Sequence, residues 1–419
     1  MNKPIRLYYL CFALYAAIIG LCLWFASANT VPDAYTGTAA DPSTFMSAEQ
    51  LRSSEVYSAQ RNWLFFVSYP WEWGIYIVLL FGGYAKRWEE RLEQTRLPFA
   101  ARLSIFAFVV SAVAFIVRLP LRFTGYTLSR SNGISTQPFA GWIRDKLVAF
   151  GVDTLIMLLV AAVAYWFIRK GGRWWLKLWL LSIPFTLFLM YIQPVVIDPL
   201  YNQFSRLSDT ALEQKIERLA ADAGISTERV FEVDMSTKTN ALNAYVDGIG
   251  PSLRIVLWDT TLKRMSEDEI MMIVAHEIGH YTMHHLEWSV LGAVGGSLVM
   301  LWLGSVVLGF IIRNWGASWG ICKVGQTSSL PLILLLLSVL SFASLPFSNA
   351  VSRQAERAAD RYAERLIGHS GSAVSMQQKL AKATLDEVNP PWFVQLFRST
   401  HPSALERIVD AEAFENKNR

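Results

Sequence analysis

Long apolar runs limit this chain of 419 residues to folds that sit in a membrane. A helix needs about 20 apolar residues to cross a bilayer, and runs of that length recur along the sequence. Hydrophobic residues make up 53% of the chain and charged residues only 17%, against about 25% charged in a soluble protein. The sequence therefore predicts a mainly α-helical, polytopic membrane protein. The predicted spans are 7–27, 63–84, 102–118, 147–168, 175–196, 289–312 and 328–347.

Charge gives a first indication of partners. Basic residues such as Lys86, Arg87 and Lys170 stand at the ends of the apolar runs, where they can meet lipid headgroups. The net charge of +4 is too small to indicate a nucleic-acid partner. We therefore expect membrane lipids, and no nucleic acid, among the partners.

The first run has two interpretations. Lys3 and Arg6 precede it, and Ala26-Ser27-Ala28 resembles a cleavage site, so a signal peptide is one alternative. The run is longer, however, than the roughly 7–15 apolar residues in the core of an ordinary signal peptide. We favour a retained transmembrane helix.

Two polar segments and two groups of apolar runs divide the chain into four parts. Residues 1–197 carry the first five predicted helices, and residues 289–347 carry the sixth and seventh. Residues 198–288 and 348–419 hold most of the polar periodicity. We interpret these two polar segments as the halves of one extramembrane domain.

The first polar segment mixes helix and strand patterns. Residues 209–223 have helical spacing, and 230–235 and 253–258 are short β-type runs. Ser266 followed by Glu269 is a capping box that opens a helix, which we expect to run on into the sixth span. A small α/β domain is therefore expected. In the second polar segment, residues 349–366 are read as a separate helix that follows the seventh span.

The strongest chemical signal is His276-Glu277-Ile278-Gly279-His280. Residues four apart lie one turn above each other on a helix, so both imidazoles can reach one metal ion. The glutamate then lies beside the bound water as its general base. A catalytic zinc site needs three protein ligands and one open position. His276 and His280 are thus candidate ligands, and Glu277 is the candidate base.

The third ligand must come from elsewhere. His284 and His285 are close in sequence, but three ligands on one helix cannot surround an ion. Glu356 and Asp360 lie four apart on a later helix, so Glu356 could ligate while Asp360 orients a histidine. The plainer alternative, that both are solvated acids among neighbouring arginines, is left open by spacing alone.

A longer pattern resembles a known family. Residues 349–360 resemble the N-x-x-S-R-x-x-E-x-x-A-D signature of the type I CAAX prenyl endopeptidases, which are seven-span zinc proteases. Residues 194–204, 254–260 and 400–408 resemble further segments of that family. The resemblance runs from about residue 60 to the end of the chain. It implies helices around a water-filled chamber and a gluzincin-like domain at the membrane face.

The resemblance also implies roles for single residues. One Zn²⁺ per chain would be held by His276, His280 and Glu356, with Glu277 activating water. Asp360 would orient a ligand, although the family's descriptions sometimes make this residue a proton donor.

Other implied roles lie further from the metal. Asn243, Ala244 and Tyr245 would bind substrate, because an edge strand there could pair with an extended backbone. His401 would hydrogen-bond the oxyanion, and Arg407 would fix a nearby acid.

The family resemblance does not explain some features of the sequence. Glu72 and Asp153 are intramembrane acids, which are costly to bury; Asp153 is expected to line the chamber, with a buried pair to an arginine or lysine as the alternative. His284 has no assigned role. Residues 28–62 are expected to form an ordered or partly ordered loop of unknown purpose.

Two arguments disagree on how the protein is oriented in the membrane. The loop 85–102 carries five Lys or Arg residues, which by the positive-inside bias would place it in the cytoplasm. The resemblance instead places the catalytic segments there, together with loops 28–62 and 118–146. We follow the resemblance.

The predicted activity is that of a zinc metalloendopeptidase of the membrane. A water activated by zinc would attack the peptide bond, with Glu277 passing its proton to the leaving amine. By resemblance the substrate is a peptide or protein, possibly lipidated, that loses the last three residues of a prenylated C-a-a-X terminus. A quality-control protease with no prenyl requirement is one alternative, and a non-enzymatic, zinc-bearing sensor or transporter is another. Glu277 argues against the latter, because a structural zinc site needs no general base.

Overall fold

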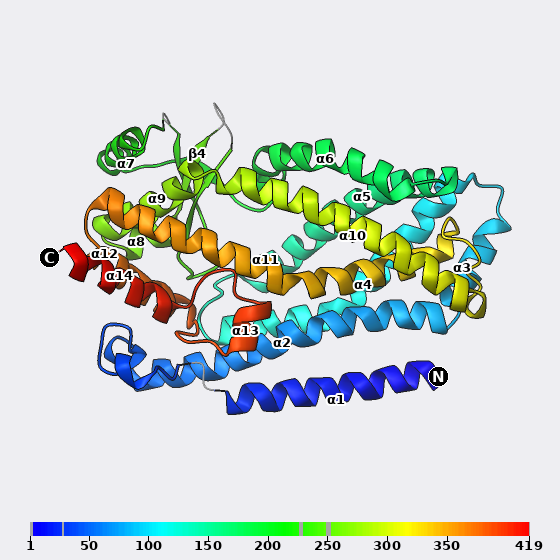
Figure 1. Ribbon diagram of the computed structural model, residues 1–419, viewed down its shortest axis with the longest axis horizontal. Helices are drawn as coiled ribbons and strands as arrows, with labels where there is room; N and C mark the ends of the chain where they lie inside the picture. Colours follow the sequence, from blue (N-terminus) through cyan, green and yellow to red (C-terminus); the bar gives the residue numbers. More distant parts are fainter. Residues whose placement is uncertain (1–2, 27–28, 226–228, 249–252, 419) are drawn as a thin grey trace.

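The structure is a computed structural model that describes residues 3–26, 29–225, 229–248 and 253–418. Among these residues, seven helices are long and apolar enough to cross a membrane, as the apolar runs predict. They lie roughly along one direction, with a small mixed domain at one end of the bundle (Figure 1). The spanning helices are α1 (Lys3–Phe25), α2 (Ala48–Phe81), α4 (Phe99–Ser131), α5 (Phe139–Lys170), α6 (Trp174–Ile192), α10 (His285–Trp315) and α11 (Leu330–Ile367).

Several of these helices are longer than predicted. The span predicted at 102–118 lies within α4, which continues through Pro120. Proline is tolerated in membrane helices, where neighbours and side chains satisfy the freed backbone groups. The helix α1 packs along α2, and Trp63 of α2 donates to the carbonyl of Ala16 at 2.9 Å. Residues 27 and 28 of the possible cleavage site lie outside the described residues, so retention of α1 stays a prediction.

The largest difference between the predicted and the observed helices is at the seventh span. The helix predicted at 349–366 is not separate, because α11 runs unbroken from Leu330 to Ile367. One rigid element therefore leads from the membrane bundle into the extramembrane domain.

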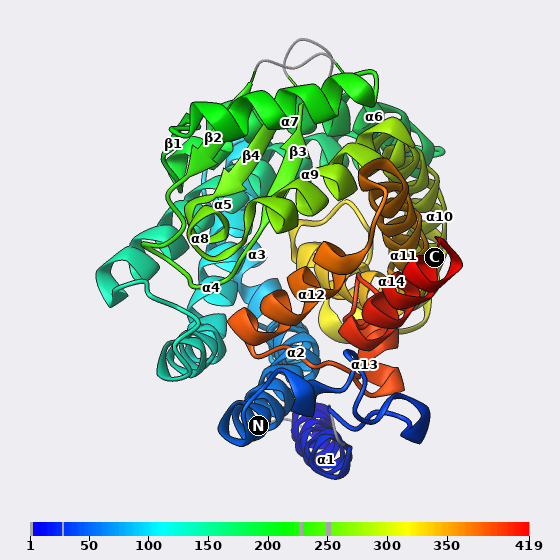
Figure 2. The ribbon, with the colours of Figure 1, turned by 90° about the vertical axis from the view of Figure 1, so that its left-hand side faces the viewer.

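The extramembrane domain contains a four-stranded sheet in the order β1-β2-β4-β3. The strands β2 and β4 are parallel, and the other two pairs are antiparallel. The helices α7 and α9 contact each other and share one apolar core with β2 and β4, and α7 runs across the strands (Figure 2). The predicted apolar face of α7 is buried, with Leu212, Ile216 and Leu219 in the domain core. These elements are β1 (Phe204–Arg206), α7 (Thr210–Asp222), β2 (Val230–Val233), β3 (Ala244–Asp247), β4 (Arg254–Trp258), α8 (Asp259–Arg264) and α9 (Glu267–Thr282).

Short helices complete the domain after α11. They are α12 (Gly371–Thr384), α13 (Trp392–Phe397) and α14 (Ala404–Asn418). At the opposite end of the bundle, α3 (Tyr84–Glu93) is anchored by Glu89, whose buried carboxylate accepts from the backbone and hydroxyl of Thr327. The four-part division of the chain stays a proposal.

The segment 28–62 has a clear structural role. Residues 29–62 of it are described by the structure, and their last part is the beginning of α2, which starts at Ala48. It packs on the C-terminal segment, where Asn389 Nδ2 donates to the Thr30 carbonyl at 2.7 Å and Gln378 Nε2 to that of Ala39 at 2.8 Å. The first and last parts of the chain therefore support each other.

The two intramembrane acids differ in their surroundings. Glu72 Oε2 lies 3.0 Å from Arg118 Nη1 and is thus paired with an arginine. Asp153 lines a cavity of about 140 Å³ together with Arg118 and Arg122. Two arginines therefore lie beside this acid, and its expected position along a large chamber stays a prediction.

Candidate metal centre

The helix α9 is built to begin sharply and to bury one face. Its N-cap is Ser266, and the expected capping box with Glu269 is present in both directions. The Glu269 carboxylate is 3% exposed and lies 2.6 Å from Lys379 Nζ on α12. Burial opposes the charge of this carboxylate, but Lys379 and the Ser266 backbone outweigh it and lower the pKa of Glu269. The start of α9 is thereby held against α12.

Close packing of α9 on α11 brings the two halves of the site together. At the contact, a Cβ added to Gly279 would lie 3.0 Å from Cδ1 of Tyr362 and 3.2 Å from its Cβ. The neighbouring α11 residues Ala359 and Ala363 are also small and fully buried. Small side chains therefore let the two helices approach closely where the metal ligands face each other.

The three predicted ligands do meet in the structure. His276 Nε2 and His280 Nε2 lie 3.1 Å apart, and Glu356 oxygens lie 3.3 Å and 3.4 Å from them. A tetrahedral zinc with bonds of about 2.0–2.1 Å requires ligand atoms about 3.3–3.4 Å apart. Among the described residues no hydrogen-bond donor satisfies Glu356 Oε2, although this atom is buried. The donor set, its spacing and this orphaned oxygen fit a zinc ion.

The outward nitrogen of each histidine also has a neighbour. His276 Nδ1 lies 2.9 Å from Asp360 Oδ1, and His280 Nδ1 lies 2.9 Å from His285 Nδ1. Such contacts orient a ligating imidazole and select its tautomer. Asp360 is held in turn by Arg407, which donates to its two oxygens at 2.9 Å and 2.5 Å.

A break after α9 positions His285, which the sequence reading considered only as a possible ligand. The helix does not run on into the sixth span, because His284 adopts a left-handed conformation with φ of 57°. The new helix α10 begins at His285, whose ring faces His280. The side chain of His284 is exposed, and its Nδ1 lies 3.1 Å from Glu287 Oε1. Residues 281–288 contain no glycine or proline, so the sequence carried no ordinary signal for this break.

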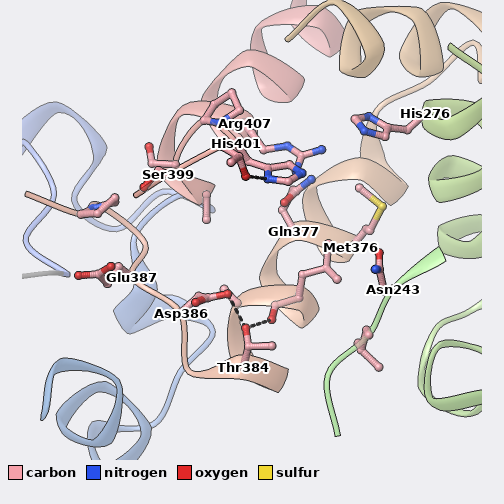
Figure 3. A pocket seen from close by; sticks show the side chains of 18 of the residues that line it. Asn243, His276, Met376, Gln377, Thr384, Asp386, Glu387, Ser399, His401 and Arg407 are labelled. Carbon is pink, nitrogen blue, oxygen red and sulfur yellow. Dashed lines mark hydrogen bonds between the residues drawn. The ribbon is translucent and has the colours of Figure 1, made fainter. Parts of the chain in front are cut away.

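A cavity of about 410 Å³ is lined by one of the three ligands, His276 (Figure 3). Its walls include His276 and Glu277 from α9, Asn243 just before β3, Ala244 in β3, and His401. Burial raises the pKa of Glu277, against the opposing charges of His276 and His280. A base with a raised pKa is better matched to proton transfer near neutral pH.

The strand β3 lies at the edge of the sheet, as the substrate-binding prediction requires. Asn243 is fixed before it, with its N–H donating to Thr261 Oγ1 at 2.8 Å and its Oδ1 accepting from the Ala244 N–H at 2.9 Å. Tyr245, the third residue of that prediction, is not among the residues that line the cavity, so its role stays a prediction.

The segment with His401 is held by the signature residues of α11. Arg353 donates to the carbonyls of Gln395 and Ser399 at 2.7 Å and 2.8 Å. His401 Nε2 then lies 3.4 Å from Glu356 Oε2, with its side chain 56% exposed. The histidine therefore faces the metal ligands from the cavity side.

Family models match nearly the whole chain. Residues 206–415 match the model described as peptidase family M48. Residues 26–203 match a model described as the CAAX prenyl protease N-terminal region with five membrane helices. The chain belongs to peptidase family M48. It is thus a metalloprotease, and M48 membership implies a metal ion and a peptide or protein substrate.

Individual relatives agree with this assignment. The M48 chain is 42% identical to the uncharacterized metalloprotease YhfN of Bacillus subtilis, over 99% of this chain and 98% of the relative. It is 30% identical to the CAAX prenyl protease 1 homolog of Oryza sativa subsp. japonica, over 70% and 69% of the two chains. The crystal structure of S. mikatae Ste24p shares the fold, with a TM-score of 0.81, 21% identity, and coverage of 98% and 100%. The multi-pass membrane fold of the M48 chain is therefore established.

Proposed function

We propose that this protein is a zinc endopeptidase that removes the C-terminal three residues from prenylated C-a-a-X substrates. One observation carries the proposal: ligand atoms from α9 and α11 stand at the spacing that zinc requires, and one of these ligands, His276, lines a cavity that also includes Ala244 of the edge strand β3. An edge strand can add an extended peptide through main-chain hydrogen bonds. Substrate would therefore lie along β3 and pass the metal ligands.

Each chain would hold one zinc ion through His276, His280 and Glu356. When bound, zinc supplies Lewis acidity to the scissile carbonyl and lowers the pKa of water. Glu277 accepts the proton of the attacking water and delivers it to the leaving amine. Its place on α9, directly after His276 and on the cavity wall, supports this role.

The remaining residues hold and orient the reacting groups. Asp360 keeps His276 in the tautomer whose Nε2 lone pair faces the metal, and Arg407 keeps Asp360 charged and in place. His401 donates to the oxygen of the former carbonyl as negative charge develops there. The contact of its Nδ1 with Thr400 Oγ1, at 2.9 Å, supports this orientation because it leaves Nε2 facing Glu356.

A lipidated substrate is supported by the position of the site. The ligand Glu356 is carried on the membrane helix α11, and the cavity also includes Arg61 of α2. A substrate anchored by a prenyl chain would reach such a site from the bilayer. The relatives named CAAX prenyl protease 1 point to the same substrate class, and we place the catalytic segments on the cytoplasmic side.

The test uses purified protein with matched farnesylated and plain peptides that end in the same four residues. We expect release of the C-terminal tripeptide from the farnesylated peptide, at a kcat/KM well above that of the plain peptide. Glu277→Gln should abolish cleavage with zinc still bound. Glu267→Gln is the matched control, because Glu267 lies on the same helix, is exposed and pairs with Lys215.

Two results would contradict the proposal. Persistent cleavage by Glu277→Gln with zinc bound would refute the assigned base. Cleavage of unprenylated, misfolded membrane proteins only would favour a quality-control protease instead.

A further inference from the structure

The catalytic cavity has a charged end that the proposed mechanism does not use. Four ionisable residues line it in addition to the catalytic groups: Arg61, Asp386, Glu387 and Arg398. Figure 3 shows Asp386 and Glu387 on the side of the cavity away from His276. Arg61 comes from α2, and the other three come from the segment between α12 and His401. We call these four residues the arginine end.

The acids of the arginine end already have partners. Asp386 Oδ1 lies 2.5 Å from Arg61 Nη2, and Asp386 Oδ2 accepts from Thr384 Oγ1 at 2.6 Å. Glu387 Oε1 accepts from Asn62 Nδ2 at 2.5 Å. A cationic group of a substrate would therefore find these carboxylate oxygens occupied.

The guanidinium groups of Arg61 and Arg398 have unused N–H donors. Each carries five N–H donors in a planar fork. Arg61 Nε is buried, and among the described residues it has no hydrogen-bond partner. Arg398 donates through Nη1 to Asn62 Oδ1 at 2.6 Å, and this nitrogen lies 3.7 Å from Glu387 Oε2. Unused donors in a cavity favour an anionic ligand over a cationic one.

Charge favours the same ligand. Burial raises the pKa of Glu387, against the opposing charges of Arg398 and Arg61. Because this shift disfavours the charged form of the acid nearest to Arg398, it acts in favour of an anionic rather than a cationic ligand at the arginine end.

We propose that the arginine end binds the C-terminal carboxylate of the substrate. Arginine recognises carboxylates with paired N–H donors and an opposite charge. A peptide extended along β3 would place its last residue about three residues beyond the scissile bond, roughly 10 Å away. Fixing the carboxylate there would determine that cleavage releases a tripeptide. The inference rests on the proposed C-terminal cleavage and names the group that sets its register.

The test compares two farnesylated peptides that differ only at the C-terminus, one a free carboxylate and the other a carboxamide. For the wild type we expect a kcat/KM roughly tenfold to a hundredfold higher on the carboxylate, the range of a charge-assisted hydrogen bond. Arg61→Gln should lower kcat/KM on the carboxylate and leave the carboxamide nearly unchanged, while Arg61→Lys keeps part of the preference. Arg52→Gln is the control, because Arg52 is an exposed arginine on the same helix outside the cavity.

A second measurement needs no variant. The free tripeptide acid should inhibit the wild type at least tenfold more strongly than the tripeptide amide, by the same charge-assisted contact. Equal cleavage of both peptides, or equal inhibition by acid and amide, would overturn the carboxylate site while leaving C-terminal proteolysis intact. Cleavage of neither peptide, with activity on other proteins, would instead overturn the proposed substrate class and the inference with it.

Discussion

Replacing Gly279 by alanine should damage metal binding more than folding. The new Cβ would lie 3.0 Å from Tyr362 Cδ1 and 3.2 Å from its Cβ, which is about 0.5 Å closer than an ordinary carbon contact. The histidine ligands are on α9 and Glu356 is on α11, so separating the helices by that amount would stretch the ligand set. Metal–ligand distances tolerate only about 0.2 Å.

The magnitude follows from the cost of overpacking. Forcing an extra methyl into a close contact costs about 1–3 kcal/mol. If the apo protein relieves this strain by separating α9 from α11, zinc must restore the contact when it binds. The affinity for zinc should then fall roughly fivefold to 150-fold. The folded state should lose less, because alanine is about 0.5–1 kcal/mol better than glycine inside a helix.

The assay is zinc affinity by competition with a chromophoric chelator, with thermal unfolding measured in parallel. Gly292→Ala is the matched control, since Gly292 lies within α10 and a Cβ there meets nothing within 4 Å. Adding Tyr362→Ala to Gly279→Ala should recover part of the affinity, because the ring is removed while the tyrosine Cβ position stays filled. Wild-type affinity in Gly279→Ala would refute the close helix approach as the cause of the ligand spacing.

Two further predictions concern residues around the ligands. His285→Ala should weaken zinc binding roughly tenfold to a hundredfold, because His280 loses the neighbour that orients it. The control His284→Asn should bind zinc normally, because asparagine tolerates the left-handed backbone. An equal loss of zinc affinity in both variants would contradict the orienting role of His285. Lys379→Met should lower the free energy of unfolding by about 2 kcal/mol at neutral pH, because the buried Glu269 carboxylate loses its cationic partner. The pKa of Glu269 is lowered in the folded protein, so this pair stabilises the fold above the ordinary value of 4.5 and loses its effect as pH falls below it. Thermal unfolding of both proteins from pH 7.5 to pH 4 should therefore show a converging difference, and a constant difference would exclude the ion pair as its source.

Local patterns were predicted well because their causes are local. The capping box of Ser266 and Glu269, the apolar face of α7 and the positions of the membrane helices depend on residues within a few turns of each other. The pair His276 and His280 belongs to the same class, since helix periodicity alone places both rings on one face. Glu356 lies beyond that range, and it was favoured over the solvated-acid alternative only through the longer signature around it.

The sequence by itself determined the membrane character of this protein and the chemistry of its metal ligands. Only the tertiary structure decided how the ligands are held. The left-handed turn at His284, the unbroken course of α11 and the support of residues 29–62 by the C-terminal segment all depend on contacts between distant parts of the chain. Such contacts are selected by packing, where the small surface of Gly279 admits Tyr362, and packing between distant residues leaves no periodic pattern in a single sequence.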